Sequence, residues 1–277
     1  MTTTLATSAR TDLPAGGTTF ANVLRSEWVK LWSLRSTTWT LIATFVVTVG
    51  FTTLISWANE ASYGKANRGP DQATFDPTSV SLAGIAFGQL AIAVLGALVV
   101  TAEYSSGGIR TTFTAVPQRL KVLGAKLLSF AVVAFVTGLV TCFTCFFIGQ
   151  LFFSVKHIEA HLGDPHVLRA VIGGGLFIAG SGLFGFALGT LLRKTAATVT
   201  AAAALLFVLP LMSNLLTLVP GSWGPAITRY FTTNAGGHIT DVRPTSGLGP
   251  WSGYSVFTLE WAVILVLGAV LVRRRDA

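Results

Sequence analysis

Two pairs of residues in this chain have spacings that could support chemistry. Cys142 and Cys145 form a C-x-x-C, the spacing of thiol–disulfide redox motifs. They stand inside a long apolar stretch, where a thiol is poorly reactive, so we interpret them as two small packing residues. His157 and His161 are four residues apart and could share a helical face toward a metal ion. Because the acid between them, Glu159, is not in the position that H-E-x-x-H requires, we favour a solvated loop over a metal site.

Glu260 is the clear acid within an apolar stretch. At a helical rise of about 1.5 Å per residue it lies about 20 Å from the basic residues that follow it, which places it in the outer half of a membrane. One interpretation is an acid that reaches water near the outer interface, anchored by Trp261. The other is a polar contact in an outward-facing cavity, and we favour the first. Asn214 is a second intramembrane polar residue, which could hydrogen-bond to a neighbouring helix.

Several catalytic patterns are absent from the sequence. It has no G-x-x-x-x-G-K-[ST] to hold ATP phosphates. It has no G-x-S-x-G at a strand–helix turn, since the small residues 180–182 lie within an apolar stretch. The histidines are all in loops, so no serine inside a span has a base beside it. We therefore expect no catalytic residue, no metal site and no cofactor held by this chain.

The elements that carry these residues follow from composition. The chain has 277 residues, of which 52% are apolar and 11% charged, whereas soluble domains have about 25% charged residues. Long continuous apolar stretches favour helices over a transmembrane barrel, and each is long enough for the roughly 20 residues that a span needs. The sequence predicts an all-α integral membrane protein, with six transmembrane helices at about 37–58, 80–102, 127–153, 170–192, 196–218 and 251–272.

The distribution of charge predicts the orientation of these spans. If the N-terminus is inside, most of the 19 basic residues fall on inner segments, so the positive-inside rule places both termini in the cytoplasm. The net charge of +8 is therefore explained by basic residues beside anionic lipid at the inner membrane surface, and we do not interpret it as a sign of nucleic-acid binding. Residues 1–19 are expected to form a disordered tail without a signal-peptide core, so the first span acts as an uncleaved anchor. We expect one domain, 20–277, in the plasma membrane.

Residues 20–35 are expected to form an amphipathic helix at the inner interface of the membrane. Its apolar face contains Val23, Trp28 and Leu31, among others. Glu27 falls on that face as an exception. It is either an exposed ion pair with Lys30, at i,i+3, or a contact with a partner, and both interpretations stay open.

Two spans carry packing signals. In the fourth, Ser181, Gly185 and Gly189 are spaced four residues apart, which allows close approach of another helix. In the fifth, Pro210 predicts a kink. The long loop after it, about 220–250, is rich in glycine and proline and could hold a short re-entrant or surface helix.

The inner loop from Glu103 to Lys126 is the most structured polar segment. It has an acid at the end of a span, the pair Gly107 and Gly108, a short threonine-rich turn, Pro117 as a breaker and a basic flank. Such a short element between two spans is one that a soluble motor could push.

On these residues the chain resembles the ABC-2 type permeases of bacterial ATP-binding-cassette exporters. Three features carry the resemblance: the segment Arg25–Leu31 with residues 34–37, the loop from Glu103 through Thr112 to Pro117, and six spans ending in an arginine-rich tail. The glycine pair departs from the more common Gly-Thr, which makes the local backbone looser.

The resemblance implies a function as well as a fold. Two permease chains would pair as a homo- or heterodimer in the bilayer, and each would dock a separate ATPase subunit that binds ATP and Mg²⁺. Substrate would be moved, outward by expectation, between the chains. The residues expected to couple to the ATPase are Glu27, Glu103, Gly107, Arg110, Thr111, Pro117 and Arg119.

Two alternatives stay open from the sequence. The chain could be a membrane anchor or assembly protein without transport, or an ion-coupled carrier that uses Glu260. The resemblance does not indicate the cargo.

Overall fold

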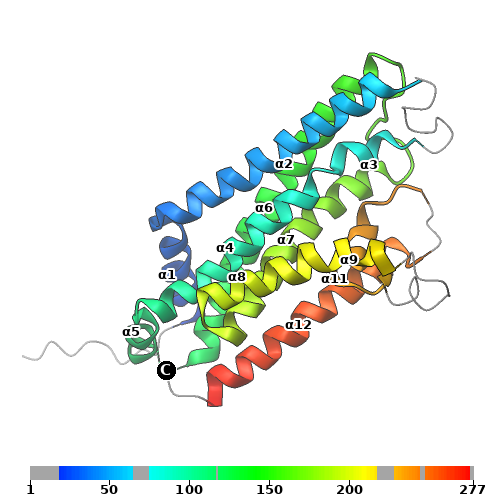
Figure 1. Cartoon of the computed structure of the whole chain (residues 1–277). Coiled ribbons are helices and arrows are strands. Elements are labelled where there is room, and N and C mark those ends of the chain that lie inside the picture. The colour runs from blue at the N-terminus through cyan, green and yellow to red at the C-terminus, as the bar shows by residue number, and fades with distance from the viewer. Residues whose placement is uncertain (1–18, 65–74, 117, 217–227, 244–246, 275–277) are drawn as a thin grey trace, which may run out of the picture.

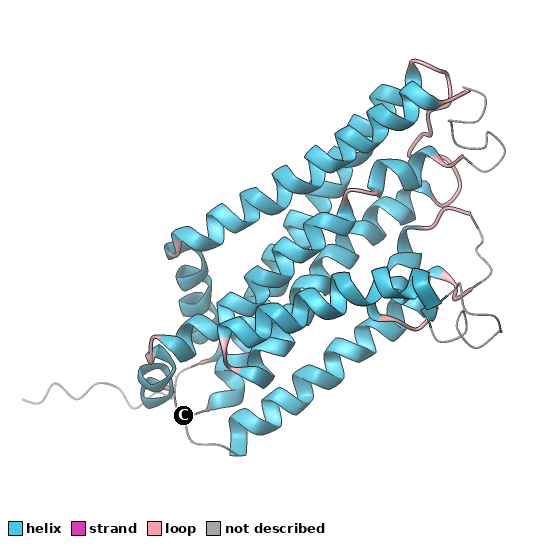
Figure 2. Cartoon of the chain, viewed as in Figure 1, coloured by secondary structure: helices cyan, strands magenta, loops and turns pink. Residues whose placement is uncertain are grey.

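The computed structural model describes residues 19–64, 75–116, 118–216, 228–243 and 247–274, and every regular element within them is a helix (Figure 2). Six helical segments in this part of the chain are long and apolar enough to cross a membrane, so the predicted number and order of spans are confirmed. They are α2 (Arg35–Ser62), α3 with α4 (Pro77–Leu82 and Ile85–Ser105), α6 (Arg119–Ser154), α7 (Val167–Leu192), the continuous α8, η1 and α9 (Thr195–Ala203, Ala204–Val208 and Leu209–Leu216), and α12 (Pro250–Arg274).

The second span is interrupted near its start, which the sequence analysis did not anticipate. Asp76 caps α3, since its side chain accepts hydrogen bonds from the backbone N–H groups of the two residues after Pro77. Proline at the first helical position completes a standard helix start. The helix then turns at Ala83 and Gly84 before α4 continues through the bundle.

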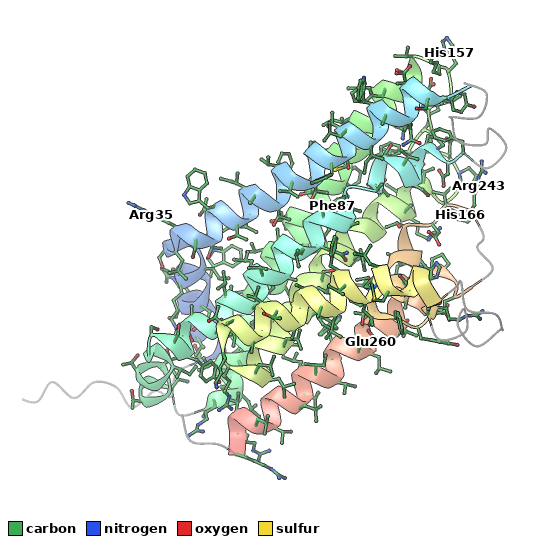
Figure 3. The ribbon with its side chains drawn as sticks, viewed as in Figure 1. Arg35, Phe87, His157, His166, Arg243 and Glu260 are labelled. Atoms are coloured by element: carbon green, nitrogen blue, oxygen red, sulfur yellow. The ribbon has the colours of Figure 1, made fainter. Side chains whose placement is uncertain are left out.

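The described chain begins and ends at the same end of the bundle, as an even number of spans requires (Figure 1). This end, called here the α5 end, carries α1 (Phe20–Ser33), α5 (Gly108–Ala115) and the last turn of α12. Arg35 lies toward it on α2, while His157, His166 and Arg243 lie at the opposite end, called the α3 end (Figure 3).

α7 is the most buried of the six spans, and it packs along α4. Gly185 lies against the backbone of Ala93, and a Cβ atom added at Gly185 would collide with it. Gly189, one turn further along, lies against Ala97 and Val100, where an added Cβ would be tightly packed and would not collide as severely. Ser181 is fully buried and donates its hydroxyl within its own helix. Small side chains thus bring two backbones together, which in lipid gains dispersion contacts.

α2 turns a polar face inward and an apolar face outward. Thr44 and Thr48 donate their hydroxyls to carbonyls one turn earlier in α2, at 2.8 and 2.6 Å. Thr52 donates to the carbonyl of Ser81 in α3 at 3.3 Å. This arrangement suits a helix that faces lipid, because hydroxyls bonded to the backbone can be buried and apolar side chains need no cover. The buried polar residues of α2 are Thr37, Thr44, Thr48, Thr52 and Ser56.

The fifth span is irregular where Pro210 was expected to disturb it. Proline has no N–H to donate, so the carbonyl of Leu206, four residues earlier, loses its α-helical partner. The side-chain amide of Gln89, from α4, donates to that carbonyl at 3.4 Å. The irregularity takes the form of a π-helical turn, η1, which ends two residues before the proline. Such turns often occur at functional positions in helices.

The long loop before α12 holds a short helix, as the sequence analysis considered. α11 (Thr232–Gly237) continues into a 3₁₀ turn, η2 (His238–Thr240), and both pack against α12 and α7. Ile239 is fully buried. Arg169, at the start of α7, donates to the carbonyls of Ile239 and Asp241. Packing and these two hydrogen bonds therefore hold α11 and η2 against the bundle.

Candidate functional site

The candidate site is built first on α1, which packs one face against α6. Thr19 caps this helix, and the residues that it buries are Val23, Glu27 and Leu31. Trp28 and Trp32 are both substantially exposed, so the bundle covers only part of the apolar face of α1. The expectation that Glu27 forms an exposed ion pair was wrong in one respect: the pair with Lys30 exists, but the side chain of Glu27 is only 3% exposed.

Glu27 belongs to a cluster of four charged side chains from three helices. Lys126, near the start of α6, lies 2.6 Å from Glu27 Oε2 and 2.8 Å from Glu103 Oε1, the latter at the end of α4. Lys30 lies 2.7 Å from Glu27 Oε1 and 3.3 Å from Glu103 Oε1. The name four-charge cluster is used below for Glu27, Lys30, Glu103 and Lys126.

The four-charge cluster is balanced, with two carboxylates and two ammonium groups. The pair formed by Lys126 and Glu27 is shielded from water, because their side chains are only 8% and 3% exposed. The side chain of Lys30, on the outside of the cluster, is 38% exposed. Burial alone would lower the pKa of Lys30, but hydrogen bonding and attraction from Glu27 and Glu103 outweigh it, so this pKa is raised. One atom is unsatisfied, because Glu103 Oε2 is buried without a hydrogen-bond partner. Breaking such a network by removing one member is costly, because a charge is left buried and unpaired.

The threonine-rich segment after α4 is a helix, α5, and not the short turn expected from its composition. Gly107 has φ +73°, a left-handed conformation that glycine adopts without strain, and it directs the chain out of α4 into α5. Thr111 and Thr112 donate their hydroxyls to the carbonyl of Gly108 at 2.8 and 3.0 Å, which supports the first turn. The glycine pair therefore sets a defined corner.

α5 is joined to the four-charge cluster and to α1. Lys30 Nζ lies 3.5 Å from the hydroxyl of Thr112, so one ammonium group contacts α1, α4 and α5 together. Between α1 and α5 there is a groove of about 370 Å³, whose wall includes Ser26, Glu27, Thr111 and Val116. α5 is therefore in contact with the cluster, whose members belong to α1, α4 and α6.

A second set of contacts at the α5 end links the remaining spans. The guanidinium of Arg193, after α7, lies 5.2 Å from the centre of the Tyr104 ring at the end of α4. Thr195 of α8 donates its hydroxyl to Thr101 of α4 at 3.0 Å. Arg119, at the start of α6, donates to the carbonyl of Val272 in α12 at 3.2 Å.

The structure brings together some of the residues that the sequence singled out for coupling. Glu27 and Glu103 share the four-charge cluster, Gly107 forms the corner before α5, and Thr111 lines the groove. Arg119 donates a hydrogen bond to α12 and also lines a small cavity together with Glu103 and Lys126 of the cluster. Arg110 is within α5, although its side chain lies outside the described residues, as does all of Pro117.

Lys126 and Thr112 are members of the site that the sequence analysis did not assign to it. A signal was available for the first: an acid on the apolar face of α1 requires a buried cation, and Lys126 lies at the start of the next long span. Thr112 has no such signal, because its contact depends on α5 being a helix.

The remaining chemical candidates lie elsewhere in the bundle. Cys142 and Cys145 are buried and free inside α6. His157 and His161 do not share a helical face, because the chain leaves α6 at Ser154 and His157 has φ +55°. Glu260 is within α12, with one carboxylate oxygen buried and without a hydrogen-bond partner.

In comparisons with known proteins, no protein-family model matches the chain and no curated protein matches its sequence.

Pro210 and Asn214 both belong to α9, and the side chain of Asn214 lies outside the described residues. The α5 end combines a balanced ionic network, which joins three helices, with a short helix that connects two spans.

Proposed function

We propose that this chain is the membrane-spanning subunit of a transporter driven by a separate ATP-binding-cassette ATPase, which docks at the α5 end. The observation that carries the proposal is the four-charge cluster with α5 beside it. A short helix between two spans, tied by Lys30 to α1 and α4, would transmit a push from outside the bilayer to α4 and α6. The sequence has no phosphate-binding loop, so the energy would come from the partner.

In this proposal the α5 end faces the cytoplasm, and α1 lies along the membrane surface. The excess of basic residues on the segments at this end supports that orientation. Trp28 and Trp32, with ring centres 6.2 Å apart, are both exposed, as suits aromatic residues at a membrane interface. The groove between α1 and α5 would receive a segment of the ATPase. A second permease chain completes the proposed transporter.

The orientation is tested by labelling with a membrane-impermeant maleimide. Both native cysteines are buried, so the wild-type chain provides a low background. We expect Thr111→Cys, in α5, to be protected in intact cells and labelled after lysis. Ser252→Cys, at the exposed start of α12, is the matched control and should react in intact cells. Labelling of Thr111→Cys in intact cells would place α5 outside, where no soluble ATPase reaches it.

The partner is tested first by reading the neighbouring reading frame, which the proposal expects to encode an ATP-binding-cassette protein, and then by expressing the two chains together. We expect the two chains to copurify, and Thr111→Cys to cross-link to this ATPase while Ser252→Cys does not. Glu103→Gln should lower the ATPase activity of the reconstituted complex and leave copurification intact. A chain that purifies without any ATPase, in membranes where the neighbouring protein is expressed, would favour an anchor or assembly protein instead.

A further inference from the structure

A second site lies within the membrane-spanning part of the bundle, away from the α5 end. α12, η1, α7 and the start of α11 enclose a groove of about 460 Å³. This volume is within the range of about 300–1,000 Å³ found for small-molecule sites. Figure 3 shows Glu260 on α12, between that helix and the α8–η1–α9 span. The walls of the groove are otherwise nearly all apolar, with Phe184, Leu205 and Val256 among them.

Glu260 is an unusual residue in such a groove. Thr232 of α11 lines the groove together with it, but Glu260 Oε2 is buried and has no hydrogen-bond partner. None of the residues that line the groove is basic. A carboxylate accepts several hydrogen bonds, and a buried acceptor without one costs free energy. The groove therefore offers an unfilled place for a positively charged hydrogen-bond donor.

The groove opens toward the surface of the bundle that faces lipid. Leu259 and Val263, which belong to its wall, are largely exposed on α12. A ligand would enter from the bilayer, so it needs an apolar body. Since lipid is as apolar as the groove, the apolar body contributes little selectivity, and the contact with Glu260 decides what binds.

We propose that this groove binds an amphipathic amine, with a protonated primary amino group on Glu260 and an apolar chain along η1 and α12. An ammonium group supplies both the charge and the N–H donors that Oε2 lacks. A quaternary ammonium supplies only the charge, a fatty alcohol only a weak donor, and a fatty acid repels the carboxylate. The proposal does not depend on transport, because binding is a property of this chain alone.

The test uses the full chain in nanodiscs of phosphatidylcholine and measures binding of radiolabelled dodecylamine. Binding to empty nanodiscs is subtracted. We expect a saturable component, competed by unlabelled dodecylamine at least tenfold better than by dodecyltrimethylammonium or dodecanol. Glu260→Gln, which keeps the side-chain shape, should weaken binding about tenfold to a hundredfold, the range expected for a hydrogen bond to a charged group.

Two further variants separate the site from general effects. Val256→Trp should remove binding by filling the groove while Glu260 stays in place. Glu60→Gln, which removes an acid at the α3 end, is the matched control and should bind as the wild type does. The proposal is overturned if the wild type shows no saturable binding, if dodecanol competes equally, or if Glu260→Gln binds as well as Glu60→Gln.

Discussion

Replacement of Lys126 by methionine tests whether the four-charge cluster holds the α5 end together. Lys126 pairs with Glu27 and Glu103, at 2.6 and 2.8 Å, and its side chain is nearly inaccessible to water. Its loss leaves two carboxylates with Lys30 as their one remaining ammonium partner in the cluster. Removing one partner of a buried ion pair costs about 3–5 kcal/mol, and because Lys30 still contacts both acids we expect about 3 kcal/mol.

The matched control is Lys30→Met, which changes the net charge of the cluster by the same amount. The side chain of Lys30 is more than one-third exposed, so water screens its contacts, and we expect a loss of about 1 kcal/mol or less. Combining Glu27→Gln with Lys126→Met leaves Glu103 and Lys30 as a neutral pair. The double variant should therefore lose about 1–3 kcal/mol less than the sum of the two single variants.

These differences are measured by equilibrium unfolding in mixed micelles of dodecyl maltoside and dodecyl sulfate, followed by tryptophan fluorescence. Hydrogen exchange of the α1 amides reports whether α1 is released before the spans separate. The reasoning fails if Lys126→Met and Lys30→Met are destabilised equally, within about 0.5 kcal/mol, since burial would then have no influence on the contribution of each lysine.

Two other substitutions and one pH dependence test the packing and charge of the bundle. Gly185→Ala should lower the free energy of unfolding by about 1–3 kcal/mol because of backbone overlap, whereas Gly50→Ala, whose added methyl group meets open space, should be neutral or stabilising. Gln89→Leu should cost about 1–3 kcal/mol by leaving a carbonyl unpaired, and much less in a Pro210→Ala background, where the helix can supply an N–H to that carbonyl. Because its pKa is raised from 10.5, Lys30 should stabilise the fold below about pH 10.5 and lose this effect as the pH rises further, so wild type and Lys30→Met should converge in strongly alkaline buffer.

Each of these has a contrary outcome in the same unfolding assay. Equal losses for the two glycine variants would mean that α4 and α7 are not in close contact. If Pro210→Ala leaves the loss from Gln89→Leu unchanged, the side-chain amide of Gln89 does not compensate for the N–H that Pro210 lacks. A difference between wild type and Lys30→Met that does not decrease at all as the pH rises beyond 10.5 would show that packing, and not charge, explains the effect of Lys30.

The number and order of spans could be predicted because hydropathy is a local property of about 20 consecutive residues. The start of the second span could not be predicted as closely, although Asp76 and Pro77 form a recognisable helix start. Hydropathy is averaged over a window of many residues, so it does not reveal a break of two small residues, Ala83 and Gly84, within an apolar stretch.

The four-charge cluster was beyond local reasoning, because its contacts join α1 to residues far along the chain. Glu27 on an apolar face was the available clue, and both interpretations offered for it assumed a solvent-exposed or partner-bound acid. Glu27 can lie on the apolar face of α1 because that face packs against the bundle, where Lys126 pairs with the buried carboxylate. The helical state of α5 was missed for another reason: threonine has low intrinsic helix propensity, and here its hydroxyls bond to the backbone of their own helix.

The threonine face of α2 has a mechanical consequence. Thr44 and Thr48 return their hydroxyls to their own helix, and among the described residues of that face Thr52 alone forms a hydrogen bond to a neighbouring helix. Hydrogen bonds therefore contribute little to holding α2 in place, and close packing holds it instead, since Gly84 and Gly88 of the second span leave room for Thr48 and Thr52. α2 directly follows α1 in the chain, so bulky side chains at Gly84 or Gly88 would change the position of α2 and with it the position of α1.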